Sequence, residues 1–333
     1  MCPEYNATTS VRRYFMKRIS CYPTHNRRFS ERSKLKYRLF LFWSRSCLFL
    51  CAAAAIFFLF FTSKKNIFPP IPSCPDEWEG FRQMKLEQEL MAVLSELSNQ
   101  TDTDKYKLLA VLMASAGFYF PDDEYSCRLP HTLAEYDIAE DYYEKRYQKE
   151  LALLQSSYQT LLADIKYFPV MKSSRDREQN FSTAGIAYAD GWLAERNYQN
   201  SSHLHEGTDI MALNNRRGYY PIVSMTDGVV ENIGWLEKGG YRVGIRSPHG
   251  AYFYYAHLYR YADGLEKGSV VQAGQLLGFM GDSGYSKVEG TVGNFDVHLH
   301  LGIYLKTSHY EELSVNPYWI LKLVESDTVI GNY

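Results

Sequence analysis

The sequence predicts an α+β protein with an N-terminal membrane helix, a small helical domain and a C-terminal antiparallel β-sandwich or open barrel. Three observations lead to this prediction. The uncharged run Cys47–Thr62 is apolar on every side. Apolar residues then recur every three or four positions, as in amphipathic helices. From Trp192 onward, short apolar stretches alternate with glycine-containing turns, and no helical pattern separates them, which favours β-structure.

The N-terminal segment is strongly basic although the chain as a whole is nearly neutral. The 333 residues suggest more than one domain, and their net charge of −2 gives no indication of nucleic-acid binding. Before residue 46 many Lys and Arg residues are opposed only by Glu4 and Glu31. Because basic flanks of a membrane segment stay in the cytoplasm, residues 1–46 are predicted to be a cytoplasmic segment.

Residues 47–63 are predicted to be a transmembrane signal anchor. The run is slightly short for a span of about 20 residues, but Leu39–Trp43 extend it if Arg45 snorkels to the interface. A cleaved signal peptide is the alternative, although Lys64 and Lys65 follow the apolar core where small residues mark a cleavage site. We therefore expect a single-pass protein of the cell membrane, with its N-terminus cytoplasmic and its later domains extracytoplasmic.

A proline-rich linker is expected over residues 64–75, in an extended conformation. Beyond the predicted membrane helix there are two cysteines, Cys74 and Cys127. In an oxidising compartment they can form one disulfide, and two separate thiols are the open alternative. Neither belongs to a Cys-x-x-Cys pair, so neither is a candidate zinc ligand.

Residues 76–170 are predicted to form the helical domain. A first helix is indicated by Leu86, Leu90, Val93 and Leu97, and a second by Lys105–Ala116, which ends at Gly117. Residues 118–131 are expected to be a loop. A long helix is then predicted from Thr132 to Lys166, with a stripe of packing residues: Tyr143, Tyr147, Leu151, Leu154, Tyr158, Leu161 and Ile165. This domain is expected to serve as a spacer or as a surface for a protein partner.

The polar stretch Met171–Ala184 is expected to end the helical region, and residues 185–325 to form the β domain. Predicted strands follow in quick succession: Gly218–Ser224, Val229–Trp235, Tyr241–Arg246 and Tyr252–His257. A glycine-rich connection, Glu237–Gly240, predicts a hairpin between the second and third of these strands. His249 lies in the next turn and is expected to be solvated.

The stretch Phe295–Ile303 has apolar residues at every second position, the pattern of a half-buried strand. Four residues are predicted to face the core: Val297, Leu299, Leu301 and Ile303. His298 and His300 then share the opposite face with Asp296. Two imidazoles on a rigid strand can hold a metal and a catalytic base, although solvated histidines are an equally simple interpretation of this stretch alone.

Two further histidine motifs lie upstream. His205-Glu-Gly-Thr-Asp209 leads into an apolar stretch, and His257 ends a β-rich run. Two histidines and a carboxylate make a three-ligand zinc site with an open fourth position, which is the catalytic arrangement of zinc. The spacing differs from the helical His-Glu-x-x-His motif, because Asp209 stands where that motif has its second histidine.

These motifs, in this order, resemble the lysostaphin-type (LytM-like) zinc metallopeptidases that cut peptidoglycan peptides. The family pattern is His-x-x-x-Asp, a histidine near the end of a strand, and His-x-His. The matching residues are His205, Asp209, His257, His298 and His300. The stretches Asp227–Val230, Gly274–Gly278 and Gly281–Gly284 also agree. The resemblance covers Trp192–Leu305, about a third of the chain.

The resemblance implies one zinc ion per chain, held by His205, Asp209 and His300, with His257 and His298 as the catalytic histidines. It implies a membrane-anchored bacterial zinc metalloendopeptidase that hydrolyses a stem peptide or cross-bridge of peptidoglycan. Bound zinc lowers the pKa of water to about 7, and a base and a donor must serve the reaction. The sequence does not assign these roles between the two catalytic histidines.

Other polar residues near the motifs are given minor roles. Glu206 follows a ligand histidine, but in an extended chain it points away from that histidine and is expected to be solvated. His203 is expected at the edge of the groove. The loops Trp235–Tyr241 and Gly281–Asn294 are rich in glycine and tyrosine, which suits walls of a groove for an extended peptide.

Other functions were weighed against this one. The alternative is a catalytically silent LytM-like scaffold or binding module that recruits or activates other cell-wall proteins; such relatives usually lack a ligand, and none is missing here. A second alternative is an active enzyme that acts mainly on another protein. Val271–Gly278 also resembles a lipoyl or biotinyl carrier, but Lys287 is a poor acceptor lysine in its context and the histidines would have no role.

Overall fold

The computed structural model describes residues 68–73, 79–119, 128–174, 185–198 and 201–333, which fall within one compact unit, Lys65–Tyr333. The predicted cytoplasmic segment, the signal anchor and both Cys74 and Cys127 lie outside the described residues. Among the helices that are described, none is both long enough and apolar enough to cross a membrane.

The helical part is organised around a central buried helix, α4. Its helices are α2 (Glu79–Arg82), α3 (Gln88–Ser98), α4 (Lys105–Ser115), α5 (Leu133–Arg146) and α6 (Gln148–Leu162), with a 3-10 turn at Gly117–Tyr119. The carboxylate of Asp104 accepts hydrogen bonds from the N–H groups of Tyr106 and Lys107 and so caps α4. Nearly every side chain of α4 is buried, because α3, α5 and α6 pack around it. The first two predicted helices are confirmed.

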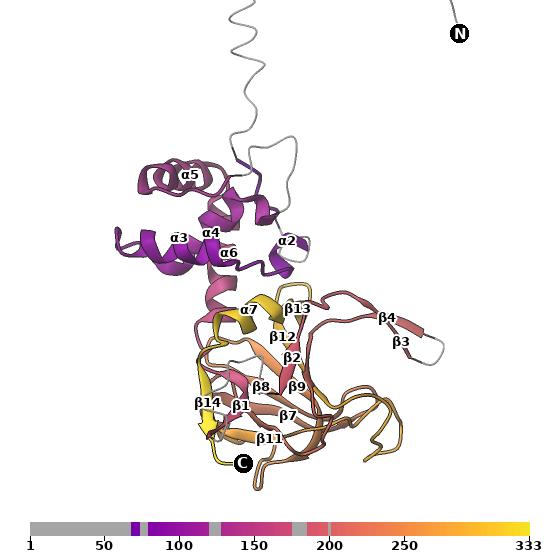
Figure 1. Ribbon diagram of the computed structural model, residues 1–333. Helices are drawn as coiled ribbons and strands as arrows, with labels where there is room; N and C mark the ends of the chain where they lie inside the picture. The colour runs from indigo at the N-terminus through magenta and orange to yellow at the C-terminus, as the bar shows by residue number, and fades with distance from the viewer. Residues whose placement is uncertain (1–67, 74–78, 120–127, 175–184, 199–200) are drawn as a thin grey trace, which may run out of the picture. The chain divides into compact units, whose positions relative to one another are not determined.

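The long helix predicted from Thr132 to Lys166 is wrong as a single element. Tyr147 leaves the helical conformation, with φ −136° and ψ 33°, and it both ends α5 and begins α6. Figure 1 shows the two helices running in different directions. The predicted stripe is nevertheless buried on both sides of the break, as Tyr143 and Tyr158 show, since each half packs against the same core.

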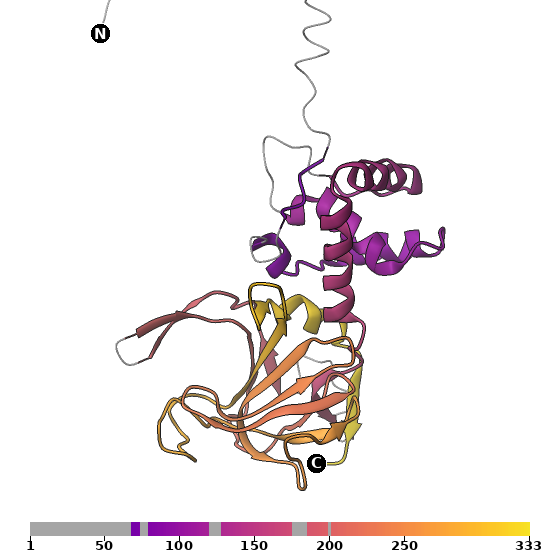
Figure 2. The same cartoon turned by 180° about the vertical axis from the view of Figure 1, so that it is seen from behind.

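The β part is a curled, mostly-β half-barrel (Figure 2). Its strands are β1 (Phe168–Ser173), β2 (Ile186–Tyr188), β3 (Glu195–Tyr198), β4 (Ser201–Leu204), β5 (Thr208–Ala212), β6 (Pro221–Val223), β7 (Gly228–Leu236), β8 (Gly240–Arg246), β9 (Tyr252–Tyr261), β10 (Val270–Val271), β11 (Leu276–Met280), β12 (His298–Leu305), β13 (Leu313–Val315) and β14 (Thr328–Gly331). A short helix, α7 (Pro317–Leu323), follows β13. The prediction of an open barrel agrees with this arrangement.

The main path of the sheet runs β10-β7-β8-β9-β11-β6-β1-β14. A branch leaves β9 through β12 to β5 and β2, with β13 also paired to β12. The pairings between described strands are antiparallel except for β1 with β14. The small hairpin β3–β4 is separate from this sheet. The hairpin predicted around Glu237–Gly240 is confirmed as β7–β8.

The sheet reaches further along the chain than the sequence patterns indicate. The polar stretch expected from Met171 begins inside β1, which pairs with both β6 and β14. Phe168, Pro169 and Val170 are buried there, so the sheet takes in the last residues of the stretch that was expected to belong to the helical domain. β2 likewise precedes Trp192, and β14 follows residue 325.

The helical and β parts meet through polar contacts at two places. Asp164, just after α6, accepts hydrogen bonds from the N–H (2.7 Å) and the ring Nδ1 (2.8 Å) of His249. His249 is exposed, as expected, with 45% of its side chain accessible, and it also makes this hydrogen-bonded contact. At the second place, the guanidinium of Arg82 in α2 donates to the carbonyl oxygen of Ser314 in β13, at 3.0 Å.

Candidate active site

The register of β12 places three of the predicted site residues on one face. β12 lies between β5 and β9, with His300 directly opposite Asp209 and His298 opposite Met211. Directly paired residues share a face, and so do residues two apart along a strand. The opposite face carries the predicted core residues, all 2% exposed or less: Val297, Leu299, Leu301 and Ile303.

His205 is held at the loop between β4 and β5. Its N–H donates to the carbonyl oxygen of Ala194 at 2.9 Å, and its ring Nδ1 donates to the carbonyl oxygen of Gly191 at 3.0 Å. In the neutral ring this leaves a lone pair on Nε2. A Cβ at Gly207 would lie 2.4 Å from Cε1 of His300, so the absence of a side chain there lets the loop pass over that ring.

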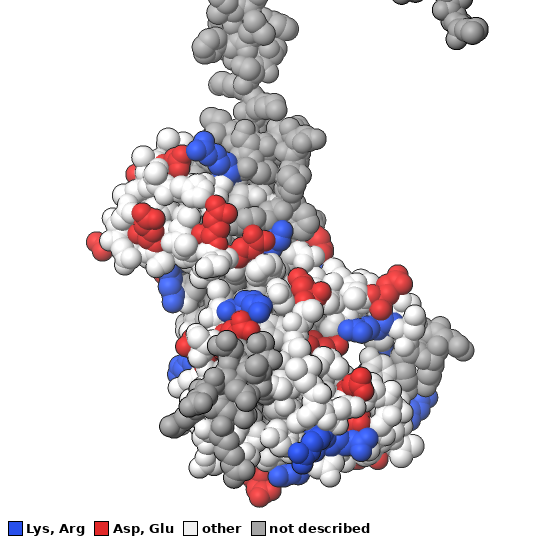
Figure 3. All heavy atoms as spheres, viewed as in Figure 1, with Lys and Arg blue, Asp and Glu red and all other residues white. Residues whose placement is uncertain are grey.

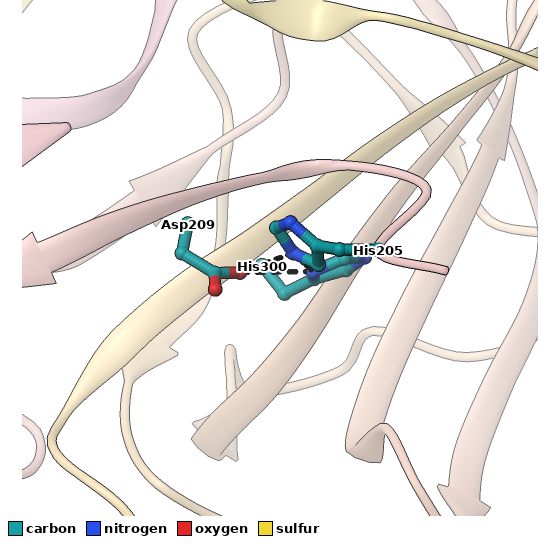
Figure 4. Close-up of side chains that lie close together, drawn as sticks. All are labelled: His205, Asp209 and His300. Carbon is teal, nitrogen blue, oxygen red and sulfur yellow. Dashed lines mark hydrogen bonds and ion pairs between the residues drawn. The ribbon is translucent and has the colours of Figure 1, made fainter. Parts of the chain in front are cut away.

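Three ligand-type atoms meet at the floor of the site (Figure 4). Nε2 of His205, Oδ1 of Asp209 and Nδ1 of His300 are each 3.0 Å from the other two. Zinc bonds of about 2.0–2.1 Å in a tetrahedron give ligand separations of about 3.3 Å, close to this triangle. Two imidazole lone pairs and a carboxylate oxygen facing one another form a donor set that fits a cation. Among the described residues, these three side chains form the group of His, Cys, Asp and Glu residues whose ligand atoms all lie within 4.8 Å of one another.

The second oxygen of Asp209 has a partner of its own. Oδ2 accepts a hydrogen bond from Nη2 of Arg196, at 3.0 Å. Burial raises the pKa of Asp209, but the close approach of His205, His300 and His298 lowers it by more than that, so the pKa lies well below its usual range and the carboxylate is ionised. Arg196 therefore fixes the orientation in which Oδ1 faces the two imidazoles.

His257 reaches the site through a β-bulge. Between the pairs Tyr255–Val243 and Leu258–Tyr241, β9 contains one residue more than β8. His257 lies in this bulge with φ 62°, a left-handed backbone that a residue with a side chain rarely adopts. Its N–H donates to the carbonyl oxygen of Gly239 at 2.8 Å. The bulge brings its ring centroid to 4.7 Å from that of His298.

The δ nitrogens of both catalytic candidates are engaged by backbone carbonyl groups. Nδ1 of His257 donates to Ser283 at 2.8 Å, and Nδ1 of His298 donates to Asp296 at 2.7 Å. Burial lowers the pKa of His257 well below its usual range, and burial also lowers the pKa of His298 although Asp209 opposes this. Both rings are neutral at neutral pH, so each can accept a proton at Nε2.

The site lies in an open groove. Cavities of about 600 Å³ and about 540 Å³ meet over the cluster. They share five lining residues: Arg196, His205, Asp209, Phe295 and His298. The predicted groove loops supply Lys238, Gly239, Tyr285 and Asn294, and His203 also lines the larger cavity, as expected. A continuous cleft on both sides of the cluster suits an extended chain.

Some contacts of the site were not expected from the sequence. Glu206 is exposed, as predicted, but its Oε1 also lies 3.2 Å from Nη2 of Arg82. The sequence reasoning missed Arg196, whose position within a polar hairpin carries no signal of its contact with Asp209. It also missed the two half-buried tyrosines that wall the larger cavity, Tyr254 and Tyr304, which alternate along their strands like ordinary packing residues.

A mostly-β half-barrel whose groove contains this cluster of histidines and an aspartate defines the chain as a hydrolase of the peptidase class. The family model "Peptidase family M23" matches residues 203–317. The chain belongs to this family, the LytM-type peptidoglycan endopeptidases.

Three relatives illustrate the likeness. A solved structure from Ruminococcus gnavus, which carries the name glycyl-glycine endopeptidase LytM, is 42% identical with a TM-score of 0.63; the match covers 77% of this chain and 94% of that one. An L-Ala–D-Glu endopeptidase of Bacillus subtilis is 41% identical over 134 residues, or 40% of this chain, and the match spans only 38% of that relative's length. The catalytic domain of lysostaphin from Staphylococcus simulans is 25% identical, with a TM-score of 0.32 and coverage of 41% and 92%.

The match to the Ruminococcus gnavus protein extends beyond the β part. Residues 168–333 make up half of this chain, whereas that match covers 77% of it. The likeness therefore includes much of the helical part as well.

Proposed function

We propose that this chain is a zinc metalloendopeptidase that hydrolyses peptide bonds in peptidoglycan. The observation that carries the proposal is the triangle of His205 Nε2, Asp209 Oδ1 and His300 Nδ1, with 3.0 Å edges at the floor of an open groove. His205, Asp209 and His300 would hold the zinc ion. When bound, zinc supplies Lewis-acid polarisation of the scissile carbonyl group and lowers the pKa of water to about 7.

Proton transfer is then carried out by two histidines of the chain, His257 and His298. The neutral rings of His257 and His298 stand side by side, with their centroids 4.7 Å apart. One ring takes a proton at Nε2 from the attacking water and then delivers this proton from the same Nε2 to the leaving amine. The other ring, once it has taken up a proton at Nε2 from solvent, donates it to the developing oxyanion. Phe295 lies against both rings, at centroid distances of 4.6 and 5.1 Å, and limits their contact with bulk water.

The names of the relatives indicate two candidate bonds. One relative acts on an L-Ala–D-Glu bond and the other is named for a glycyl-glycine bond. Both are peptide bonds of an extended chain, which the groove on either side of the cluster would accommodate. The complete set of five site residues argues against the silent scaffold considered above.

The activity is tested on the full chain in detergent with purified peptidoglycan and with peptides that contain each bond. We expect new amino groups to appear, to stop after chelation and to return when zinc is added. A chain that binds zinc but cleaves neither the wall preparations nor the peptides would support the scaffold instead.

We also propose that residues 47–63 anchor the enzyme in the cell membrane, with the catalytic part outside the cytoplasm. Only the sequence supports this proposal: the apolar run and its basic N-terminal flank. The protein should remain with the membrane fraction after alkaline extraction, and an external protease should reach its C-terminal part. Release into the soluble fraction at alkaline pH would contradict the anchor.

A further inference from the structure

The larger cavity of the groove has a lysine on one wall and a polar hairpin on the other. Lys238 lies at the tip of the β7–β8 hairpin and lines this cavity, together with Arg196 and His203 from β3 and β4. None of these residues belongs to the set of five site residues. Their charges bear on which peptide the groove prefers.

The backbone of the β7–β8 tip is fixed next to His257. The carbonyl oxygen of Gly239 accepts the N–H of His257 at 2.8 Å. The carbonyl oxygen of Lys238 accepts the N–H of Tyr285 at 3.1 Å, and that of Glu237 accepts the N–H of Ser286 at 2.9 Å. Three hydrogen bonds therefore hold the base of the Lys238 side chain beside the catalytic candidates, within reach of a bound peptide.

Two cationic side chains line this cavity, those of Arg196 and Lys238. Among the described residues, Lys238 has no ion-pair partner. The cavity contains two carboxylates, those of Asp209 and Glu206. Asp209 binds Arg196 at 3.0 Å and faces the metal-binding cluster. Glu206 is paired with Arg82 at 3.2 Å. Both negative charges are thus matched by other groups, and the charge of Lys238 remains for a ligand.

The opposite wall presents a second polar group. Arg196 and His203 are directly paired in the β3–β4 hairpin, so their side chains share the face that borders the cavity. Nδ1 of His203 is buried and has no hydrogen-bond partner among the described residues. Because Nδ1 is closed to the cavity as well as to bulk water, a ligand that reaches this ring forms its hydrogen bond with the other ring nitrogen, Nε2.

We propose that Lys238 and His203 bind a free carboxylate of the substrate, so that the enzyme prefers peptides with an acidic residue at the scissile bond. Glutamate in an L-Ala–D-Glu bond uses its amino group and one carboxyl group in the chain, and it keeps one free carboxylate. A glycyl-glycine bond offers no such group. Lys238 supplies the charge and His203 a hydrogen bond. This inference rests on the proposed function and narrows it.

The test compares two peptides that differ only in this carboxylate. One contains L-Ala–D-Glu, and the other has the same free carboxylate converted to a primary amide. The full chain in detergent is assayed with zinc. Because Lys238 is exposed, we expect a modest preference, about fivefold in kcat/KM, for the carboxylate peptide. Lys238→Gln should lose this preference by slowing the carboxylate peptide alone, and Lys238→Glu should favour the amide.

Lys287→Gln is the matched control. It removes the same charge from an exposed lysine in the neighbouring loop, and Lys287 does not line the groove. Its preference for the carboxylate peptide over the amide peptide should equal that of the parent protein. If Lys287→Gln reduces the preference as much as Lys238→Gln, long-range charge explains the effect and the proposed site is wrong.

A binding measurement keeps this inference separate from the proposed activity. Calorimetry with the zinc-loaded chain and the two peptides made uncleavable by an N-methylated scissile amide reports affinity even if neither parent peptide is cleaved. Tighter binding of the carboxylate peptide, lost in Lys238→Gln and His203→Ala, supports the site without any turnover. Equal affinity for the two peptides, or an equal loss of both in Lys238→Gln, would overturn it. Absence of cleavage together with selective binding would reject the peptidase function alone.

Discussion

At the scale of single residues, the site depends on which ring nitrogen each histidine turns inward. Backbone carbonyl groups of Gly191, Ser283 and Asp296 accept the Nδ1–H of His205, His257 and His298. Each neutral ring is thereby held in the tautomer that leaves Nε2 free for the reaction or the metal. These tautomers are set by backbone carbonyl groups, which do not titrate. The orientation of the three imidazole rings therefore does not change with pH.

Arg196 offers a direct test of metal orientation. Arg196→Ala removes the 3.0 Å hydrogen bond to Oδ2 of Asp209 and frees the carboxylate to rotate. We expect zinc affinity to fall by about 10–100-fold, the usual effect of losing a partner of a metal ligand. Competition with a fluorescent chelator measures this. Arg196→Lys should recover part of the affinity, and Glu195→Ala, on the other face of the same strand, should change it little.

Sequence patterns identify individual site residues better than they identify their partners. Each of the five motif residues has a recognisable local context, such as the alternation around His298 and His300. The approach of His205 to His300, 95 positions apart in the sequence, depends instead on the register of β5 with β12. Arg196 has no local signal, because its role arises only when the folded chain brings β3 to Asp209 in β5.

At the scale of elements, two departures from prediction have a common cause. The stripe of apolar residues continues through Tyr147, so periodicity alone extends α5 into α6, although the chain changes direction there. β1 contains Pro169, a residue that sequence patterns disfavour in strands, and ends on Lys172 and Ser173; its pairing with β6 and β14 fixes it instead. In both cases tertiary packing decides the outcome over a weak or ambiguous local pattern.

The link between the end of α6 and the β8–β9 turn should depend on pH. Burial raises the pKa of Asp164, but hydrogen bonds from the backbone and ring of His249 lower it below its usual value overall. A carboxyl whose pKa is lower in the folded state stabilises the fold above its unfolded pKa of about 3.9, and this stability is lost as the pH falls through the folded value.

We therefore expect Asp164→Asn to lower the free energy of unfolding by about 1 kcal/mol at pH 7. The difference between the two proteins should shrink steadily as the pH drops below about 4. Urea unfolding at several pH values measures it, and Asp263→Asn serves as a control in an exposed turn. A difference that stays constant down to pH 2 would exclude ionisation of Asp164 as its source.

At the scale of the whole molecule, α2 connects the helical part to the active-site loop. Arg82 donates to the carbonyl oxygen and the hydroxyl of Ser314 at 3.0 and 2.9 Å, and it pairs with Glu206, the residue after His205. Its guanidinium also lies 5.6 Å from the ring centroid of Trp192. Figure 3 shows charged side chains of both signs on the face of the molecule seen there.

Arg82→Ala should therefore loosen the active-site loop as well as the domain contact. We expect a loss of about 1–3 kcal/mol in the free energy of unfolding and faster hydrogen exchange at residues 205–208. Lys85→Ala removes a half-buried charge that pairs with Glu87 near the end of α2, so it should cost less stability and leave hydrogen exchange at residues 205–208 unchanged. Faster exchange in the helices without any change at residues 205–208 would show that the two parts are not coupled through Arg82.

The central claim is that His205, Asp209 and His300 hold zinc while His257 and His298 serve the reaction. The most direct test is zinc content per chain, measured together with peptide cleavage, in His300→Ala and His298→Ala. We expect the first variant to lose both zinc and activity. The second should keep one zinc per chain and lose activity by about 100-fold or more. Full zinc occupancy in His300→Ala, or loss of zinc in His298→Ala with an intact fold, would contradict this assignment.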